Sequence, residues 1–442
     1  MSIDAATEAH TLYEAYTTPL RLGRDARVTD AATALAAIPN NGRVLIPTLS
    51  GIPRGLLQAL DDERGRWSRL KIVCGILQEH VPPLDHAGEP FHFTTWQFSA
   101  PCRAAQEAGH LDVIPTRYSQ TVAMFTPDGP YPVDAILVQV SPQGPEGRFS
   151  LGLSGGATID MVRTTPLVIA QVNAQVPYTF GASEFPRDAF DFLVEIETPV
   201  VESQRSEPGA TAERVAEHVV ELLTPGATLQ FGIGAVPEAI MARLPQGLDF
   251  GIHSGLISDG VIDVVESGAV TNIRKTDDAG VVVCAEVAGT RRIYDWVHRN
   301  PRVRLAPGRY THGLPVLSRC FALTAINSAI QVSLDGVTNA ESIGDRLLSG
   351  PGGQPDFVEA SVWSPGGIGI IAMPSTAARG KISRIVRQID PGATVTVPRH
   401  LADHVVTEFG VAQLKGRTIA QRGAALRSIS HPDFQAAMVD ER

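Results

Sequence analysis

The sequence has little of what marks secreted and metal-binding proteins. Among its 442 residues there are only four cysteines, Cys74, Cys102, Cys284 and Cys320, with no Cys-x-x-Cys pair and no histidine pair at metal-ligand spacing. Isolated cysteines of this kind predict reduced thiols in a protein core, with a reactive role for one of them as the alternative. We therefore expect reduced cysteines and no bound metal.

Long apolar runs and an excess of basic residues are also missing. No stretch approaches the roughly 18 apolar residues that a membrane-spanning helix needs, and residues 1–8 lack the basic start and apolar run of a signal peptide. The 37 basic residues are outnumbered by 47 acidic ones, and the net charge of −10 gives no electrostatic support for nucleic-acid binding. These absences predict a soluble, cytoplasmic protein that binds neither membrane nor nucleic acid.

What the chain does contain is the alternation of an α/β protein. Short apolar runs typical of buried parallel strands alternate with amphipathic stretches typical of helices. The polar segment 202–209 is the best linker candidate, so we expect two open α/β domains with largely parallel sheets, residues 1–204 and residues 205–442. The expected strands are residues 43–47, 71–75, 133–140, 167–173, 228–231, 281–284, 325–327, 369–373 and 393–396, and the expected helices include 55–60, 211–223 and one that begins near Pro237.

The most informative stretch is Phe231–Pro237, which reads Phe-Gly-Ile-Gly-Ala-Val-Pro. Gly232 and Gly234 come directly after an expected strand and before an expected helix with proline in its first turn. Such a turn presents backbone N–H groups that can hold a phosphate or a thioester oxyanion. A plain tight turn is the alternative, because the third glycine of a dinucleotide fingerprint and the lysine of a P-loop are both missing.

Further along, the chain carries a series of ordered blocks. With Phe231–Pro237 and Gly251–Gly260, they make nearly the whole chain resemble the acetyl-CoA hydrolase/4-hydroxybutyrate CoA-transferase family, a branch of the class I CoA-transferases. The resemblance implies an enzyme acting on acyl-CoA, with its active site in the cleft between two α/β domains. The blocks are Pro132–Ser141, Gly147–Gly152, Gln171–Pro177, Gly289–Trp296, Ala325–Ile330, Asn339–Gly344, Ser349–Phe357, Pro374–Ala377, Val405–Gly410 and His431–Phe434.

The resemblance also implies how coenzyme A is used. CoA is expected as part of the substrate, with no tightly bound cofactor, in a homodimer or larger homo-oligomer. Bare backbone suits the close approach of a pantetheine chain, whereas a flexible turn is the alternative for the second glycine loop. By resemblance the CoA-binding residues are Gly232, Ile233, Gly234, Ala235 and Val236 in the first loop and Gly350, Gly352, Gly353 and Gln354 in the second.

Two positions depart from the family pattern. In the family the stretch after the first loop reads His-Ser-Glu, and the glutamate is the nucleophile that carries CoA; the matching residue here is Gly255. A glycine forms neither an acyl-glutamyl anhydride nor a glutamyl-CoA thioester. The family's Ile-Asn-Ser-Ala-Ile-Glu ends in Gln331 here. The resemblance thus predicts a neutral, roomier pocket with space for a water beside the thioester.

Three other residues are candidates for orienting or deprotonating that water. Glu286 comes late in an expected buried strand, where ligands gather in open α/β sheets and where burial raises the pKa of a carboxyl group towards that of a general base. An ion pair with Arg291 or Arg292 is the alternative. His253 and Asp259 flank Gly255, with a backbone-bonded ring and a turn or helix cap as their alternatives.

We therefore expect an enzyme that hydrolyses an acyl-CoA, at the thioester or at the carbon–carbon bond of a cyclic β-keto acyl group. Glu286 or His253 would activate water, and the loop Gly232–Val236 would hold the oxyanion. Two alternatives stay open. One is CoA transfer through another carboxylate or a ternary complex, and the other is a catalytically silent CoA-binding protein.

Overall fold

The computed structural model describes residues 13–438, so the residues 1–8 considered above for a signal peptide lie outside it. The described chain divides into two compact units. The first runs to Gln204 and takes in Val283–Thr311 as well, and the second comprises Arg205–Val282 and the chain from His312 onward. The first change of unit falls in the polar segment expected as a linker, but the second unit is not one continuous run of residues.

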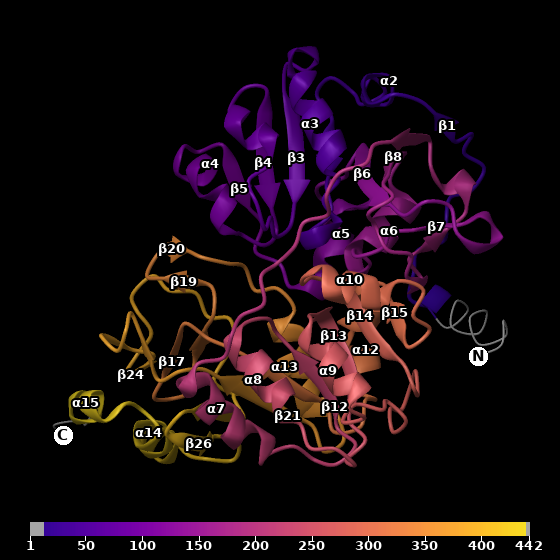
Figure 1. Ribbon diagram of the computed structural model, residues 1–442. Helices are drawn as coiled ribbons and strands as arrows, with labels where there is room; N and C mark the ends of the chain where they lie inside the picture. Colours follow the sequence, from indigo (N-terminus) through magenta and orange to yellow (C-terminus); the bar gives the residue numbers. More distant parts are fainter. Residues whose placement is uncertain (1–12, 439–442) are drawn as a thin grey trace. The chain divides into compact units, whose positions relative to one another are not determined.

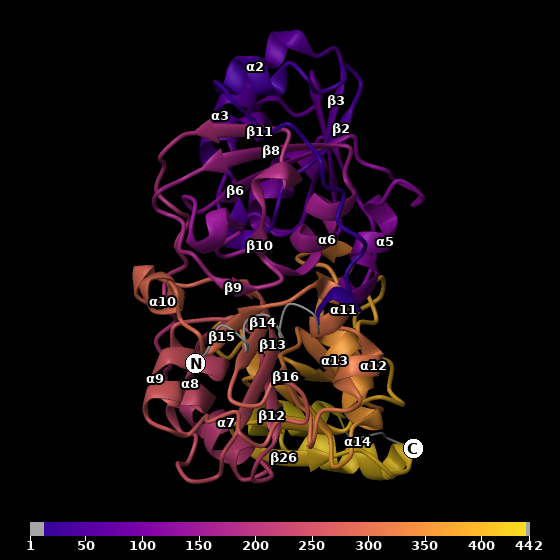
Figure 2. The same ribbon diagram turned by 90° about the vertical axis from the view of Figure 1, so that its right-hand side faces the viewer.

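An eight-stranded sheet, parallel throughout, forms the first unit. Its order is β1–β11–β8–β6–β2–β3–β4–β5; β3, β4 and β5 follow one another in Figure 1, and β6, β8 and β11 in Figure 2. The strand order reverses between β2 and β6, which makes that the topological switch point. The strands are Arg27–Val28 (β1), Arg43–Leu45 (β2), Leu70–Cys74 (β3), Phe91–Thr95 (β4), Leu111–Val113 (β5), Ala135–Val140 (β6), Leu167–Val172 (β8) and Phe192–Glu195 (β11).

Burial explains why these strands read as continuous apolar runs. All six residues of β6 are buried, as expected for a parallel strand covered on both faces. The first unit also contains α2 (Ala31–Leu35), α3 (Arg54–Asp62), α4 (Arg103–Glu107), α5 (Thr121–Phe125), α6 (Gly156–Thr164), α10 (Arg291–Val297) and α11 (Gly308–Thr311), and the strands β7 (Phe149–Ser150), β9 (Phe180–Gly181), β10 (Glu184–Phe185), β14 (Val282–Val287, its first residue counted with the second unit) and β15 (Val303–Leu305).

Six strands of the second unit lie in the order β26–β25–β21–β16–β12–β13, parallel except for the edge strand β26. The order reverses between β12 and β16, so this unit's switch point lies where those two strands end. The strands are Thr228–Phe231 (β12), Gly251–Ile257 (β13), Thr324–Asn327 (β16), Ile368–Ala372 (β21), His404–Thr407 (β25) and Gly410–Gln413 (β26).

Helices and short strands complete the second unit. The helices are α7 (Ala210–Val220), α8 (Ala235–Ala242), α9 (Gly260–Glu266), α12 (Leu314–Leu317), α13 (Gln354–Trp363), α14 (Ile419–Ser428) and α15 (Pro432–Gln435). The short strands are β17 (Gln331–Ser333), β18 (Thr338–Asn339), β19 (Ser342–Ile343), β20 (Arg346–Leu347), β22 (Thr376–Ala377), β23 (Ile382–Ser383) and β24 (Ile385–Val386). Within residues 13–438 no helix combines the length and apolar character that a membrane crossing requires.

One expected strand is wrong. Residues 393–396 form no strand. Side chains hold the segment instead: Thr396 Oγ1 donates to Glu341 Oε1 at 2.7 Å, and the backbone N–H of Thr394 donates to Ser342 Oγ at 3.0 Å. A run of β-branched residues is typical of a strand, but threonine hydroxyls also stabilise irregular backbone. The other expected strands and helices are confirmed, and all four cysteines are buried free thiols.

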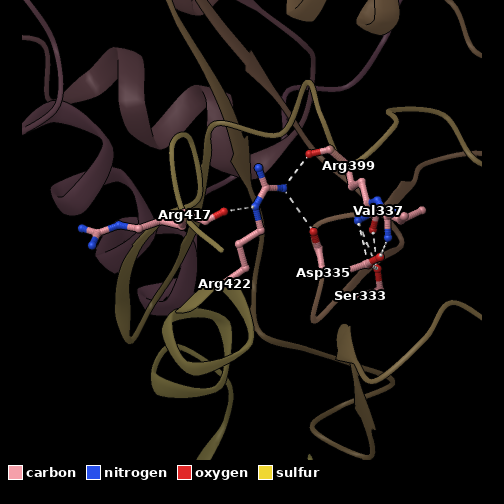
Figure 3. Close-up of polar contacts among 6 residues, drawn as sticks. All are labelled: Ser333, Asp335, Val337, Arg399, Arg417 and Arg422. Atoms are coloured by element: carbon pink, nitrogen blue, oxygen red, sulfur yellow. Dashed lines mark hydrogen bonds and ion pairs between the residues drawn. The ribbon is translucent and has the colours of Figure 1, made fainter. Parts of the chain in front are cut away.

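Buried Arg422 anchors helix α14 to neighbouring backbone by hydrogen bonds (Figure 3). The guanidinium of Arg422 donates to three backbone carbonyl oxygens, those of Asp335 at 3.1 Å, Arg399 at 2.6 Å and Arg417 at 3.3 Å. The carboxylate of Asp335 instead accepts from Arg399 Nη1 at 3.0 Å. Arg422 thus joins α14 to the turn after β17 and to the loop that precedes β25.

Candidate active site

The first glycine loop joins β12 to α8 at the switch point of the second unit. Gly234 is the N-cap residue of α8 and has φ 120°, a conformation that favours glycine. A Cβ atom at Gly232 or Gly234 would meet nothing within 4 Å, and Ile233 between them is 54% exposed. Neighbouring side chains therefore leave bare backbone facing open space at the N-terminus of an eight-residue helix.

Strand β13 carries His253 and Gly255 on one face, because side chains alternate along a strand. Ser254 points the other way, and its hydroxyl donates to the backbone oxygen of Phe231 at 3.1 Å. That bond ties β13 to the residue that precedes the first glycine loop. His253 is only 1% exposed.

The space that glycine leaves at position 255 is filled by the imidazole of His312. A Cβ atom at Gly255 would lie 2.6 Å from His312 Nε2 and 2.9 Å from its Cε1. A Cβ at Gly353 would lie 2.5 Å from the same Nε2 atom. The roomier pocket expected at Gly255 is therefore not present at this point. The backbones of Gly255 and of Gly353 in the second glycine loop both pack closely against the His312 ring.

His312 is the residue that the sequence did not reveal. Its ring packs edge-to-face against Phe357 of α13, with centroids 4.9 Å apart. Burial, with a smaller effect from nearby His253, lowers the pKa of His312 to about 3, so the ring is neutral near pH 7. In the sequence it is a lone histidine outside every family block; two glycines 98 positions apart gave the only signal, and only their shared neighbour explains them.

The second glycine loop leads into α13. Gly352 has φ 54°, and Gly353 is the N-cap of the helix. Gln354 begins the helix, and its Nε2 atom is buried with no hydrogen-bond partner among residues 13–438. The loop therefore offers bare backbone and one unused amide donor. Gly350, also expected to bind CoA, precedes this turn.

Asp259 stands before the first residue of α9 and is 3% exposed. Its backbone is helical, with φ −52° and ψ −33°, and its side chain makes no capping hydrogen bond. The helix-cap interpretation of this residue thus lacks its characteristic hydrogen bond.

Glu286 belongs to the first unit, whereas His253, Gly255 and Asp259 belong to the second. It is 3% exposed and accepts a hydrogen bond from Tyr118 Oη at 3.0 Å. Burial raises the pKa of Glu286 to about 8, against hydrogen bonds from Ser154 and Tyr118 that lower it. Arg291, one ion-pair partner considered for Glu286, pairs with Asp295 at 2.7 Å.

Glycine is required beside Glu286 as well. Gly156 has φ 40°, and a Cβ there would lie 2.0 Å from Tyr118 Oη and 3.0 Å from Glu286 Oε1. The backbone N–H of Ala157 donates to the same phenol oxygen at 3.2 Å. A chain of hydrogen bonds thus runs from the start of α6 through Tyr118 to the carboxyl group.

Comparison with known proteins identifies the family to which this chain belongs. Residues 31–198 match the acetyl-CoA hydrolase/transferase N-terminal domain, and residues 289–442 match the C-terminal domain of the same name. The chain is 37% identical to a 4-hydroxybutyrate coenzyme A transferase of Clostridium kluyveri, over 94% of this chain and 97% of that protein. It is 33% identical to a succinyl-CoA:cyclohexane-1-carboxylate CoA transferase of Geobacter metallireducens, over 94% of each chain.

Solved structures with the same fold are similar to almost the whole chain. RipA from Yersinia pestis superposes with a TM-score of 0.86 and 26% identity, over 99% of this chain and 98% of that one. A 4-hydroxybutyrate CoA-transferase from Porphyromonas gingivalis superposes with a TM-score of 0.76 and 29% identity, over 93% of this chain and 96% of that one. The chain is therefore an enzyme of the acetyl-CoA hydrolase/4-hydroxybutyrate CoA-transferase family, with that family's two α/β domains.

Proposed function

We propose that this enzyme hydrolyses an acyl-CoA without a glutamyl-CoA intermediate. The observation that carries the proposal is the environment of position 255, which the resemblance assigns to the nucleophile. It holds no side chain, and a neutral imidazole fills the space where one would begin. CoA enters as part of the substrate, against the bare backbone of Gly232–Val236 and of Gly350–Gly353.

The reaction follows from these groups. Water attacks the thioester carbonyl carbon, and the carbonyl oxygen becomes an oxyanion held by backbone N–H groups at the start of α8. A base takes the proton from the water, the carbon–sulfur bond breaks, and the proton reaches the CoA sulfur. The products are the carboxylic acid and free CoA. Glu286 and His253 are the bases considered from the sequence.

The second candidate function is CoA transfer with another carboxylate as the nucleophile. Glu286 is the carboxylate considered for this role. Its raised pKa, about 8, keeps its carboxyl protonated at neutral pH. A protonated carboxyl group is a poor nucleophile, so transfer through Glu286 is disfavoured. The CoA-transferases among the relatives still make an acceptor acid a necessary arm of the test.

A panel of acyl-CoAs incubated in H₂¹⁸O tests the proposal, with product masses as the readout. It should include acetyl-CoA, butyryl-CoA, succinyl-CoA, cyclohexanecarbonyl-CoA and a cyclic β-keto acyl-CoA, each with and without a carboxylic acid acceptor. Hydrolysis gives free CoA and an ¹⁸O-labelled acid in the absence of the acceptor. New CoA esters that form only with the acceptor, or a covalent enzyme–CoA adduct trapped by borohydride, would contradict it.

A further inference from the structure

A pocket of about 400 Å³ lies in the first unit, where β6 and β8 end. Ser141–Gln143 follow β6, Ala174–Tyr178 follow β8, and α10 with the two residues after it supplies the rest of the lining. Ligands gather at the carboxyl ends of parallel strands in open α/β sheets, and a pocket of this volume suits a small molecule. None of its described lining residues belongs to either glycine loop.

Helix α10 supplies a basic lining. The spacing of Arg291, Asp295 and His298 places them on one helix face. The guanidinium of Arg291 is held in place, because its Nε donates to Asp295 Oδ1 at 2.7 Å and its Nη1 to Gln175 Oε1 at 3.1 Å. The amide of Gln175 is fixed in turn, since its Nε2 donates to Glu197 Oε1 at 2.6 Å. A cation is therefore positioned at the pocket in advance of any ligand.

The imidazole of His298 is fixed as a hydrogen-bond donor. Its Nδ1 atom accepts from the backbone N–H of Tyr178 at 3.0 Å. Burial and the neighbouring Arg299 lower the pKa of His298, so the neutral ring predominates near pH 7. A neutral imidazole whose Nδ1 accepts carries its proton on Nε2. His298 is exposed, and its Nε2 atom adds an N–H donor to the basic lining.

Arg299 has a backbone conformation that arginine does not favour. Its φ is 51°, in the left-handed region where glycine and asparagine are the usual residues. Its N–H donates to the backbone oxygen of Tyr178 at 2.7 Å, which holds this conformation beside the pocket. The side chain is exposed and lines the pocket. An arginine at such a position indicates a use for its guanidinium at this place.

The loops after β6 and β8 supply an apolar lining, made of Pro142, Ala174, Val176 and Pro177. Pro142 and Ala174 are exposed, whereas Val176 is only 3% exposed. The apolar lining thus runs from solvent to the interior, so a ligand can reach it from outside. A ligand that meets both linings must join an anionic end to an apolar body.

Charge selects the class of anion. Among the described residues that line the pocket, Arg291 and Arg299 carry positive charge and Asp295 carries negative charge. This excess of one positive charge matches a monoanion better than a phosphate monoester, which carries about −1.5 to −2 at neutral pH. Arginine also binds carboxylates through paired N–H groups.

We propose that this pocket binds the anion of a small monocarboxylic acid. The carboxylate accepts hydrogen bonds from Arg291, Arg299 and the Nε2 atom of His298, and the hydrocarbon body packs against the apolar lining. Acids of this class are released when an acyl-CoA is hydrolysed and consumed when CoA is transferred to an acid. The inference goes beyond the proposed hydrolysis and does not rest on it, because binding of the free acid needs neither CoA nor turnover.

Saturation-transfer NMR titrations of the full chain with hexanoate test the proposal. Hexanoate should bind, and saturation should reach its methylene groups. Hexanamide has nearly the same shape without the charge, and acetate has the charge without the apolar body. Both should bind at least about tenfold more weakly than hexanoate. Inorganic phosphate at equal concentration should not displace hexanoate.

Two matched variants locate the binding. Arg299→Asn removes a guanidinium from the pocket and suits the left-handed backbone. It should weaken hexanoate binding about tenfold, while the melting temperature stays the same or rises. Arg379 is also exposed and has φ 58°, but it lies in the second unit and outside the pocket. Arg379→Asn should therefore have the same effect on stability and none on binding.

His298→Asn supplies a second pocket variant. The Oδ1 atom of asparagine can accept from the N–H of Tyr178 in place of Nδ1, whereas the Nε2 donor is lost. Binding of hexanoate should weaken about three- to tenfold. This variant tests the site if Arg299→Asn fails to fold.

Several outcomes would overturn the proposal. Hexanoate that binds the wild type and both pocket variants equally well would lie elsewhere on the enzyme. Equal binding of hexanamide would make the pocket purely apolar, and displacement of hexanoate by phosphate would make it a phosphate site. A wild type that does not bind hexanoate would also contradict it. An enzyme inert towards every acyl-CoA, in contrast, would overturn the proposed hydrolysis and not this site.

Discussion

The carboxyl group of Glu286 carries a proton at pH values where most carboxyl groups do not, and His312 lacks one where many histidines are charged. Their pKa values, about 8 and about 3, are shifted in the directions that burial imposes on an acid and on a base. The neutral form of His312 predominates near pH 7, whereas the carboxylate of Glu286 becomes the main form only above its raised pKa.

The pH dependence of turnover therefore tests Glu286 as the base. With Glu286 as the base, kcat should rise about tenfold per unit up to the pKa of that group and level off above it. Steady-state rates at saturating acyl-CoA in buffers of constant ionic strength give the measurement, and a flat profile would rule against Glu286.

Glu286 should also make stability depend on pH. Its pKa is raised from 4.5 in the unfolded chain to about 8 when folded, so its stabilising contribution is complete below the lower value and is lost as pH rises through the higher one. Glu286→Gln removes this dependence and should gain in melting temperature relative to wild type as pH increases. Exposed Glu195→Gln in β11 is the control, and an identical difference at low and high pH would contradict the expectation.

The pairing of Gly255 with His312 predicts non-additive substitutions. Gly255→Glu alone should fold poorly, because its Cβ would lie 2.6 Å from the ring nitrogen. Combining it with His312→Gly removes the obstacle and should recover melting temperature. A double-mutant cycle measures the coupling, expected at about 1–3 kcal/mol for residues in contact. Gly232→Ala, with nothing within 4 Å of the new Cβ, should leave stability unchanged; additive effects would refute the coupling.

At the scale of elements, α14 is held by the hydrogen bonds of Arg422 as well as by the packing of its buried Leu426. Arg422→Met would leave three backbone carbonyl oxygens without their donor, and we expect it to cost about 2–3 kcal/mol. Arg417→Met, at an exposed position in the same region, should cost little. Urea unfolding of the two variants gives the comparison, and equal midpoints would show that the guanidinium contributes no net stability.

The elements also show how far sequence alone reaches. Runs such as residues 135–140 predict buried strands because both faces of a parallel sheet exclude water. The glycine loop after β12 was predicted from its place between a strand and a helix. Residues 393–396 failed because hydroxyl hydrogen bonds replaced a strand ladder. His312 could not be found, because its meaning depends on two glycines that only folding brings together.

At the scale of the whole molecule, Val283–Thr311 completes the first unit from a distant part of the chain. β15 pairs with β9, the N–H of Gly155 donates to Ala285 O at 2.8 Å, and Tyr118 bonds Glu286. A fragment of residues 1–204 should therefore be insoluble or partly folded. Replacing residues 205–282 by a flexible Gly/Ser linker within residues 1–311 should recover a folded first unit by circular dichroism. A cooperative unfolding transition in the shorter fragment would contradict this.

The return of Val283–Thr311 to the first unit bears on the order in which the protein is made. Proteins of several domains usually fold from the N-terminus as synthesis proceeds. Here the ribosome must first produce the whole of Arg205–Val282 before the last piece of the first unit emerges. All strands of the eight-stranded sheet are made before Gln204, but β14, β15, α10 and α11 of the same unit are still missing while Arg205–Val282 is synthesised. We therefore expect nascent chains that end before Thr311 to be the forms of this enzyme that aggregate most readily and need chaperones most.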